Sequence, residues 1–141
     1  MTSLELSADR RLALTAKLKA HGLRTTKPRL LLADLLFSGG NRHVTADGLF
    51  AEARRAGLRV SQATIYNTLN QFCEAGLLRE VQVDQARSYF DTNLDDHHHF
   101  YVEADGRLID IDADAVVLDK LPKAPEGYDV TGVDIVIRLR Q

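Results

Sequence analysis

Capped helical runs dominate the first half of this chain and limit what it can fold into. Thr26, Thr45 and Ser61 each precede an apolar run of helical period. A hydroxyl group at that position accepts a hydrogen bond from the backbone of the first helical turn. Gly57 and Gly76 close the last two runs, as is common where a chain leaves a helix. The pattern predicts four helices, over residues 9–21, 27–38, 46–56 and 62–75.

The period of the apolar residues changes in the segment 78–90. Val81 and Val83 alternate with polar residues, and a second run ending in Phe90 follows a polar turn at 84–86. Alternation with a period of two is typical of a half-buried strand, so the segment predicts a β-hairpin. Short helices joined by glycine-containing turns form a helix-turn-helix, and a hairpin that follows one makes it a winged helix.

The remainder of the chain predicts a second, smaller domain of mixed structure. The expected elements are strands at 98–103, 107–111 and 128–139, and a short helix at 113–121. We therefore expect an α+β fold with two domains, a winged helix-turn-helix domain over residues 1–91 and a small α/β domain over residues 92–141.

Charge divides the chain at nearly the same place. Residues 1–90 carry 13 Lys and Arg against 8 Asp and Glu, whereas residues 91–141 carry 5 against 12. A basic part joined to an acidic part fits a nucleic-acid-binding domain attached to a cation-binding or regulatory domain. The alternative is two solvated surfaces of uneven composition.

Several classes of protein are excluded by simple features of the chain. No run approaches the roughly 20 apolar residues of a membrane helix, and Glu5 and Asp9 interrupt the N-terminus. The single cysteine, Cys73, excludes an internal disulfide and a zinc site built from cysteine pairs. We expect a cytoplasmic protein without a membrane partner, in which Cys73 is a small buried residue.

The fourth predicted helix has the pattern of a DNA-recognition helix. Ile65, Leu69 and Phe72 fall on one face, which packs against the preceding helices. Amide and hydroxyl side chains on the other face suit base edges in the major groove: Gln62, Thr64, Tyr66, Asn67 and Gln71. Basic residues of the flanking turns and of the wing suit phosphates: Arg24, Lys27, Arg29 and Arg87. The alternative is an ordinary polar helix face in water.

Three consecutive histidines form a second notable feature. On a strand, His97 and His99 point to one face and His98 to the other. Paired imidazoles with nearby carboxylates suit Zn, Fe(II) or Mn(II), and an imidazole of the run can also ligate a haem iron. A solvated histidine cluster is the alternative. The acidic and histidine residues available as further ligands are His43, Asp91, Asp95, Asp96 and Asp110.

A metal-dependent hydrolase built on the histidine run is a further alternative. Such an enzyme needs an open coordination position and a positioned base in a pocket. The sequence offers carboxylates but no arrangement of nucleophile and base, and the winged helix would have no role. We therefore expect that the protein is not an enzyme.

Four segments together resemble the ferric uptake regulator (Fur) family. They are Gly22-Leu-Arg-Thr-Thr-Lys-Pro-Arg29, His43-Val-Thr-Ala-Asp47, Ser61-Gln-Ala-Thr-Ile-Tyr-Asn-Thr-Leu69 and the run ending in His99. The resemblance covers about residues 12–140. It implies a dimeric transcription regulator, with an N-terminal winged helix that binds operator DNA and a C-terminal α/β domain that pairs two subunits. Assembly beyond the dimer is left open.

The chain departs from the family pattern at informative positions. The resemblance implies that a regulatory metal site is retained, with ligands His43, Asp91, His97, His99 and Asp110. The structural zinc that the family holds with paired cysteines is absent, because Val102-Glu-Ala-Asp105 stands where a cysteine pair is usual. Asn67 replaces a usual arginine and implies a different DNA preference. A second family metal site is broken, since its positions align with Asp96, His98, Val117 and Val133.

These departures are similar to the iron response regulator (Irr) branch of the family. Tyr66-Asn-Thr-Leu-Asn70, Tyr89-Phe-Asp-Thr-Asn93 and Pro125-Glu-Gly-Tyr128 carry this resemblance. It implies a regulator of iron and haem homeostasis that responds to haem through His97, His98 and His99. The Cys-Pro haem motif of some members is absent, because Cys73 precedes a glutamate. A repressor that responds to Fe(II) or Mn(II) is the alternative.

Overall fold

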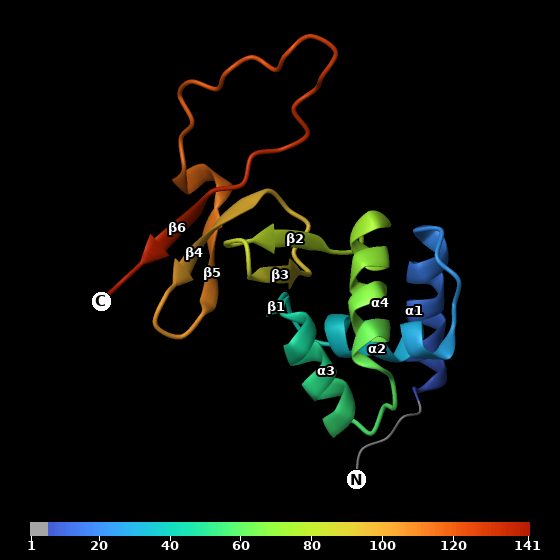
Figure 1. Cartoon of the computed structure of the whole chain (residues 1–141). Helices are drawn as coiled ribbons and strands as arrows, with labels where there is room; N and C mark the ends of the chain where they lie inside the picture. The colour runs from blue at the N-terminus through green and yellow to red at the C-terminus, as the bar shows by residue number, and fades with distance from the viewer. Residues whose placement is uncertain (1–5) are drawn as a thin grey trace. The chain divides into compact units, whose positions relative to one another are not determined.

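The computed structural model describes residues 6–141, which form two compact units. The first unit ends at Leu94 and the second spans Asp95–Gln141 (Figure 1). The sequence predicted a boundary after residue 91. Residues 1–5 of the predicted first domain lie outside the described residues.

All four predicted helices are present in the first unit, at nearly the predicted bounds. They are α1 (Ala8–Ala20), α2 (Lys27–Phe37), α3 (Ala46–Arg55) and α4 (Gln62–Glu74). The side chains of Thr26, Thr45 and Ser61 accept hydrogen bonds from the first turns of α2, α3 and α4, as predicted. Gly57 and Gly76 follow α3 and α4 with φ of 81°, a conformation that glycine adopts without a steric penalty.

A small antiparallel sheet completes the first unit. It consists of β1 (His43–Val44), β2 (Arg79–Gln82) and β3 (Ser88–Asp91), in the order β1-β3-β2. Strands β2 and β3 are the predicted hairpin. Strand β1 was not predicted, because two residues are too few to show an alternating pattern. Its pairing matters for the site, since it places His43 opposite Asp91.

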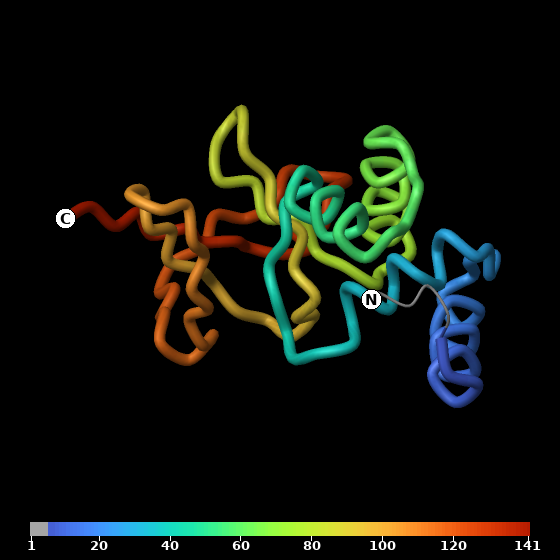
Figure 2. The backbone as a smooth tube through the Cα atoms, turned by 90° about the horizontal axis from the view of Figure 1, so that it is seen from below, coloured from blue at the N-terminus to red at the C-terminus, as the bar shows by residue number. Residues whose placement is uncertain are grey.

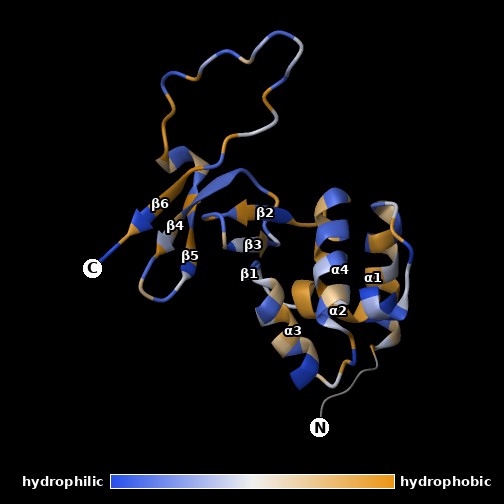
Figure 3. Ribbon diagram, in the orientation of Figure 1, coloured by the Kyte–Doolittle hydropathy of each residue, from blue (hydrophilic) through white to orange (hydrophobic). Residues whose placement is uncertain are grey.

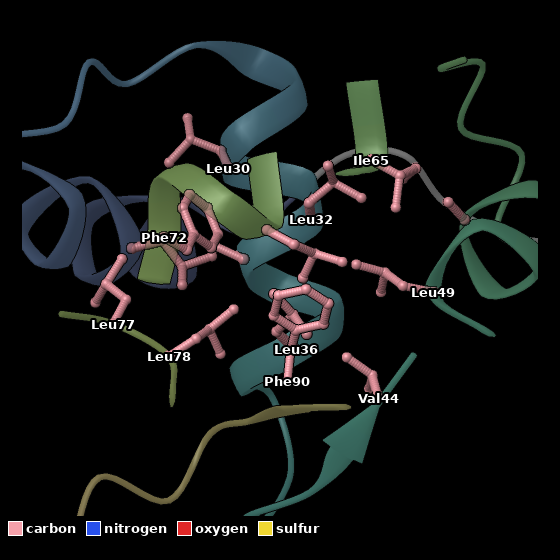
Figure 4. Packing of buried hydrophobic residues seen from close by; sticks show 14 of the residues in the cluster. Leu30, Leu32, Leu36, Val44, Leu49, Ile65, Phe72, Leu77, Leu78 and Phe90 are labelled. Carbon is pink, nitrogen blue, oxygen red and sulfur yellow. The ribbon is translucent and has the colours of Figure 1, made fainter. Parts of the chain in front are cut away.

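The core of the first unit lies around α2. Leu32 and Leu36 are fully buried and are drawn with Leu49, Phe72 and other core side chains in Figure 4. Helix α2 is largely hydrophobic, whereas α4 carries both hydrophilic and hydrophobic residues (Figure 3). One face of α4 therefore belongs to the core and the other remains available.

The second unit is built on a three-stranded sheet. Strand β4 (His97–Val102) pairs antiparallel with β5 (Arg107–Asp112) and parallel with β6 (Val136–Leu139), in the order β5-β4-β6. A turn connects β4 and β5, with Gly106 at a φ of 73°. The two units together confirm the predicted α+β fold with an N-terminal winged helix.

Two predictions about the second unit were wrong. The expected helix at 113–121 is only a short 3-10 turn, Ala113–Ala115, and the expected strand at 128–139 shrinks to β6. Residues 116–135 form neither helix nor strand, and the backbone tube of Figure 2 follows this segment without a helical coil. Apolar side chains of this loop are exposed, so burial of apolar surface does not offset the entropy cost of ordering the segment into a helix or strand.

Among the described residues, no helix combines the length and apolar character that a bilayer crossing requires.

Candidate metal centre and nucleic-acid interface

Two histidines and an aspartate of the second unit converge on one point. Strand pairing places His99 of β4 opposite Asp110 of β5, and alternation along β4 brings His97 to the same face. The Nε2 atoms of His97 and His99 lie 3.6 and 3.4 Å from the same Asp110 oxygen, Oδ1. One potential ligand atom from each residue lies within 4.8 Å of the others. Both imidazoles are about 5% exposed, so the cluster is largely shielded from water.

The protonation of His97 suits a metal ligand. Its Nδ1 faces the backbone carbonyl of Asp95, which can only accept a hydrogen bond, so Nδ1 carries the proton. In the neutral ring, Nε2 then presents its lone pair toward the cluster. Metal-binding histidines usually donate their other ring nitrogen to a carbonyl or carboxylate in this way. Nothing in the sequence signals this contact, because it uses a backbone atom.

His98 faces away from this cluster, as strand alternation predicted. Its Nδ1 accepts a hydrogen bond of 3.2 Å from the backbone N–H of Ile135, so the proton of the neutral ring lies on Nε2. The side chain is buried, with 8% exposure. Ligation of a haem iron by His98 requires that this hydrogen bond break, and the haem role of this residue stays a prediction.

The first unit contributes its own histidine–carboxylate pair. His43 of β1 and Asp91 of β3 are register partners, and His43 Nε2 lies 3.3 Å from Asp91 Oδ2. Asp91 is 1% exposed, and its Oδ1 accepts a hydrogen bond from the backbone of Asn93 at 2.9 Å. A buried carboxylate held by an imidazole and a backbone N–H is a preorganised ligand group.

The donor atoms of these two groups suit a borderline divalent cation. Imidazole nitrogens combined with carboxylate oxygens match Fe(II), Mn(II) and Zn, whereas a haem iron in proteins takes one or two axial side chains. The side chains of Asp95 and Asp96 take no part in the cluster of the second unit. All five ligands predicted from the sequence thus lie within one of two histidine–aspartate groups.

Helix α4 presents the predicted polar face to solvent. Ile65, Leu69 and Phe72 are fully buried, whereas Tyr66 is 53% exposed and Asn67 is exposed. Gln62 donates to Asp47 at 2.7 Å, and the hydroxyls of Thr64 and Ser61 lie 2.9 Å apart. Within residues 6–141, the side chains of Tyr66 and Asn67 form no hydrogen bond. These two side chains can therefore offer their hydrogen-bonding groups to an external partner.

Comparison with known proteins identifies the family. The model of the ferric uptake regulator family matches residues 20–138. The chain belongs to this family. It is 33% identical over 100 residues to the ferric uptake regulation protein of Shigella flexneri, an alignment that covers 70% of this chain and 68% of the relative.

Solved structures of Fur proteins share the fold. The Vibrio cholerae ferric uptake regulator matches with a TM-score of 0.72 at 22% identity, covering 90% of this chain and 98% of that one. The ferric uptake regulator of Pseudomonas aeruginosa with manganese matches with a TM-score of 0.67 at 26% identity, covering 90% and 96%. The protein is thus a Fur-family, metal-responsive transcriptional regulator. The comparisons leave the Irr branch a prediction.

The basic residues predicted for phosphates divide into two groups in this Fur-family protein. Arg24 and Lys27 are exposed at the start of α2, and Arg87 is exposed at the tip of the wing, with its Nε 3.9 Å from Asp84. Arg29 is half-buried instead, and its guanidinium bonds within the unit. The sequence did not predict the hydrogen bond between Gln62 and Asp47 or those of the Arg29 guanidinium. Contacts of this kind between separate segments leave no periodic pattern in the sequence.

Cys73 is half-buried on α4 beside the core of the Fur winged helix. Burial, with smaller contributions from Glu80 and Glu74, raises the pKa of its thiol to about 11. A thiol is nucleophilic only as the thiolate, so Cys73 is protonated and unreactive at neutral pH. This agrees with the predicted role of a small packing residue.

Proposed function

We propose that the protein regulates iron homeostasis by binding operator DNA as a homodimer, with an affinity that increases when Fe(II) or Mn(II) binds. The convergence of His97, His99 and Asp110, with the lone pair of His97 set by its bond to Asp95, carries this proposal. The Pseudomonas aeruginosa relative described with manganese supports the choice of ion. Zinc suits the same donor atoms.

The proposed ligand set also includes His43 and Asp91. These residues belong to the winged-helix unit, on β1 and β3, whereas the other three belong to the second unit. The family resemblance implies all five residues as ligands of the regulatory site, and this part of the ligand set stays a prediction. A dimer of winged helices reads half-sites about one helical turn apart, so in this proposal the ion acts by favouring one spacing of the two winged helices.

Haem is a second candidate signal. The three consecutive histidines and the resemblance to the Irr branch favour it, with His97, His98 and His99 as the candidate ligands. Haem binding through His98 requires that its hydrogen bond with Ile135 break. The proposed divalent cation needs His97 and His99 as ligands and leaves the hydrogen bond of His98 intact, whereas haem binding through His98 breaks that bond.

A DNA-binding titration separates these mechanisms. The metal-free protein, the protein with Mn(II) and the protein with haem are titrated with a duplex that the protein selects from a random pool. We expect Mn(II) to increase affinity at least about tenfold, which requires only about 1.4 kcal/mol of differential binding. A Soret shift together with release by haem, and no effect of Mn(II), would establish the haem mechanism instead.

Dimer formation rests on the second unit. Within the described residues, its sheet has β5 and β6 at the edges, and large apolar side chains of its strands and loop are exposed. These include Val117 at 86%, Tyr128 at 73% and Val130 at 61%. A two-fold partner is the commonest way to cover such a surface. Sedimentation at micromolar concentration should show a dimer, and a monomer there would contradict this part of the proposal.

A further inference from the structure

The guanidinium of Arg29 joins two separate segments of the winged helix. Arg29 is the third residue of α2 and is half-buried. Its Nη1 donates to the backbone carbonyl of Arg24 at 3.1 Å, and its Nη2 donates to Oε1 of Gln71 at 2.7 Å. A guanidinium presents its donors as a rigid fork, so one side chain can hold two acceptors in fixed relative positions.

Both acceptors belong to the surface proposed to bind DNA. Gln71 lies four residues after Asn67, and therefore one turn further along the same face of α4. Arg24 lies in the segment that leads into α2. These four residues line a common groove of about 370 Å³. The fork of Arg29 thus ties the segment before α2 to the exposed face of the recognition helix.

We propose that Arg29 is a positioning residue for DNA recognition rather than a phosphate ligand. By holding Gln71 and the Arg24 carbonyl, it sets where the side chains of Arg24 and Asn67 meet the duplex. The two acceptors are oxygens of this chain, so the guanidinium nitrogens that bind them are engaged within the unit and not with a phosphate. This inference rests on the proposed DNA-binding function.

Arg29→Lys tests the inference, because lysine keeps the charge but lacks the fork. The specificity ratio is measured at fixed salt, between the duplex selected by the wild-type protein and a scrambled duplex of the same composition. Loss of one or both hydrogen bonds should lower this ratio by about threefold to tenfold. The slope of affinity against salt concentration should stay that of the wild type, because no phosphate contact is lost.

Gln71→Ala removes the same bond from the other side and serves as the partner variant. If Arg29 acts through Gln71, the double variant Arg29→Lys/Gln71→Ala should lose little more specificity than either single variant. Lys27→Ala is the matched control, since Lys27 is an exposed cation on the first turn of the same helix. It should reduce the salt slope by about one and leave the specificity ratio unchanged.

Three results would overturn the inference. The first is a specificity ratio for Arg29→Lys equal to that of the wild type. The second is a salt slope that falls in Arg29→Ala as it does in Lys27→Ala. The third is a loss of specificity in the double variant equal to the sum of the two single losses. Failure of the wild-type protein to select any duplex would instead overturn the proposed DNA-binding function. Thermal unfolding of each variant checks folding, and Gln71→Ala, an exposed truncation, keeps the test decisive if Arg29→Lys is unstable.

Discussion

Replacing His99 by alanine is expected to abolish the response of DNA binding to Mn(II). The imidazole lies 3.4 Å from Asp110 and forms one side of the converging group on β4 and β5. Loss of an outer partner of a metal ligand typically costs about 10–100-fold in metal affinity, and loss of a direct ligand should cost more. Calorimetric titration with Mn(II), followed by DNA binding with and without the ion, measures both effects.

His98→Ala is the matched control for this prediction. It removes a buried imidazole from the same strand, but from the opposite face, where the ring bonds to Ile135 instead of Asp110. Mn(II) affinity should survive this change. If His98→Ala weakens Mn(II) binding as much as His99→Ala does, the ion is not held on the face that we propose. Asp110→Asn, which keeps the shape of the carboxylate, should behave like His99→Ala.

Replacing Asn67 by alanine should reduce discrimination between the selected duplex and a scrambled one. The Asn67 side chain is exposed on α4 and has no hydrogen bond within residues 6–141, so its amide is available for a base edge. A bidentate contact between asparagine and adenine in the major groove contributes about 1–3 kcal/mol of discrimination. Binding curves for both duplexes at one salt concentration measure the change. Tyr66→Ala should act in the same direction.

The comparison with Lys27→Ala makes the Asn67 result specific. A phosphate contact weakens binding to every sequence equally, whereas a base contact weakens binding to the preferred sequence alone. An unchanged specificity ratio in Asn67→Ala at fixed salt would show that α4 does not read bases through this residue. An equal loss on both duplexes would assign Asn67 to the backbone of the DNA.

Helix caps and apolar periodicity were enough to predict the helices and the hairpin of the first unit, but not the loop of the second unit. The caps at Thr26, Thr45 and Ser61 act within one helical turn, so the sequence alone places the helix starts. The segment 113–121 has apolar residues at helical spacing but no surface to pack against in its own unit, and most of it forms a loop. Whether such a segment forms a helix depends on tertiary contacts, and the spacing of apolar residues does not show whether those contacts exist.

The candidate metal centre also has features that the sequence predicts and features that it does not. Strand alternation predicted that His97 and His99 share a face, and the structure agrees. The position of Asp110 opposite His99 depends on the pairing register of β4 with β5. Residue types alone left Asp110 as one of several candidate carboxylates, and the family resemblance selected it. The protonation of His97 and His98 depends on the backbone of Asp95 and Ile135. Backbone partners carry no residue signature, so side-chain patterns do not reveal them.

Strand β3 carries a core residue and a candidate metal ligand side by side. Phe90 and Asp91 are consecutive, both 1% exposed, and they pair with Val44 and His43 of β1. A shift of the pairing by one residue would turn the aromatic ring toward His43 and the carboxylate toward the core. An ion that requires both His43 and Asp91 therefore binds only chains whose strands are paired correctly. Under the proposed function, metal binding therefore also stabilises the correctly paired strands of the winged helix relative to any other pairing.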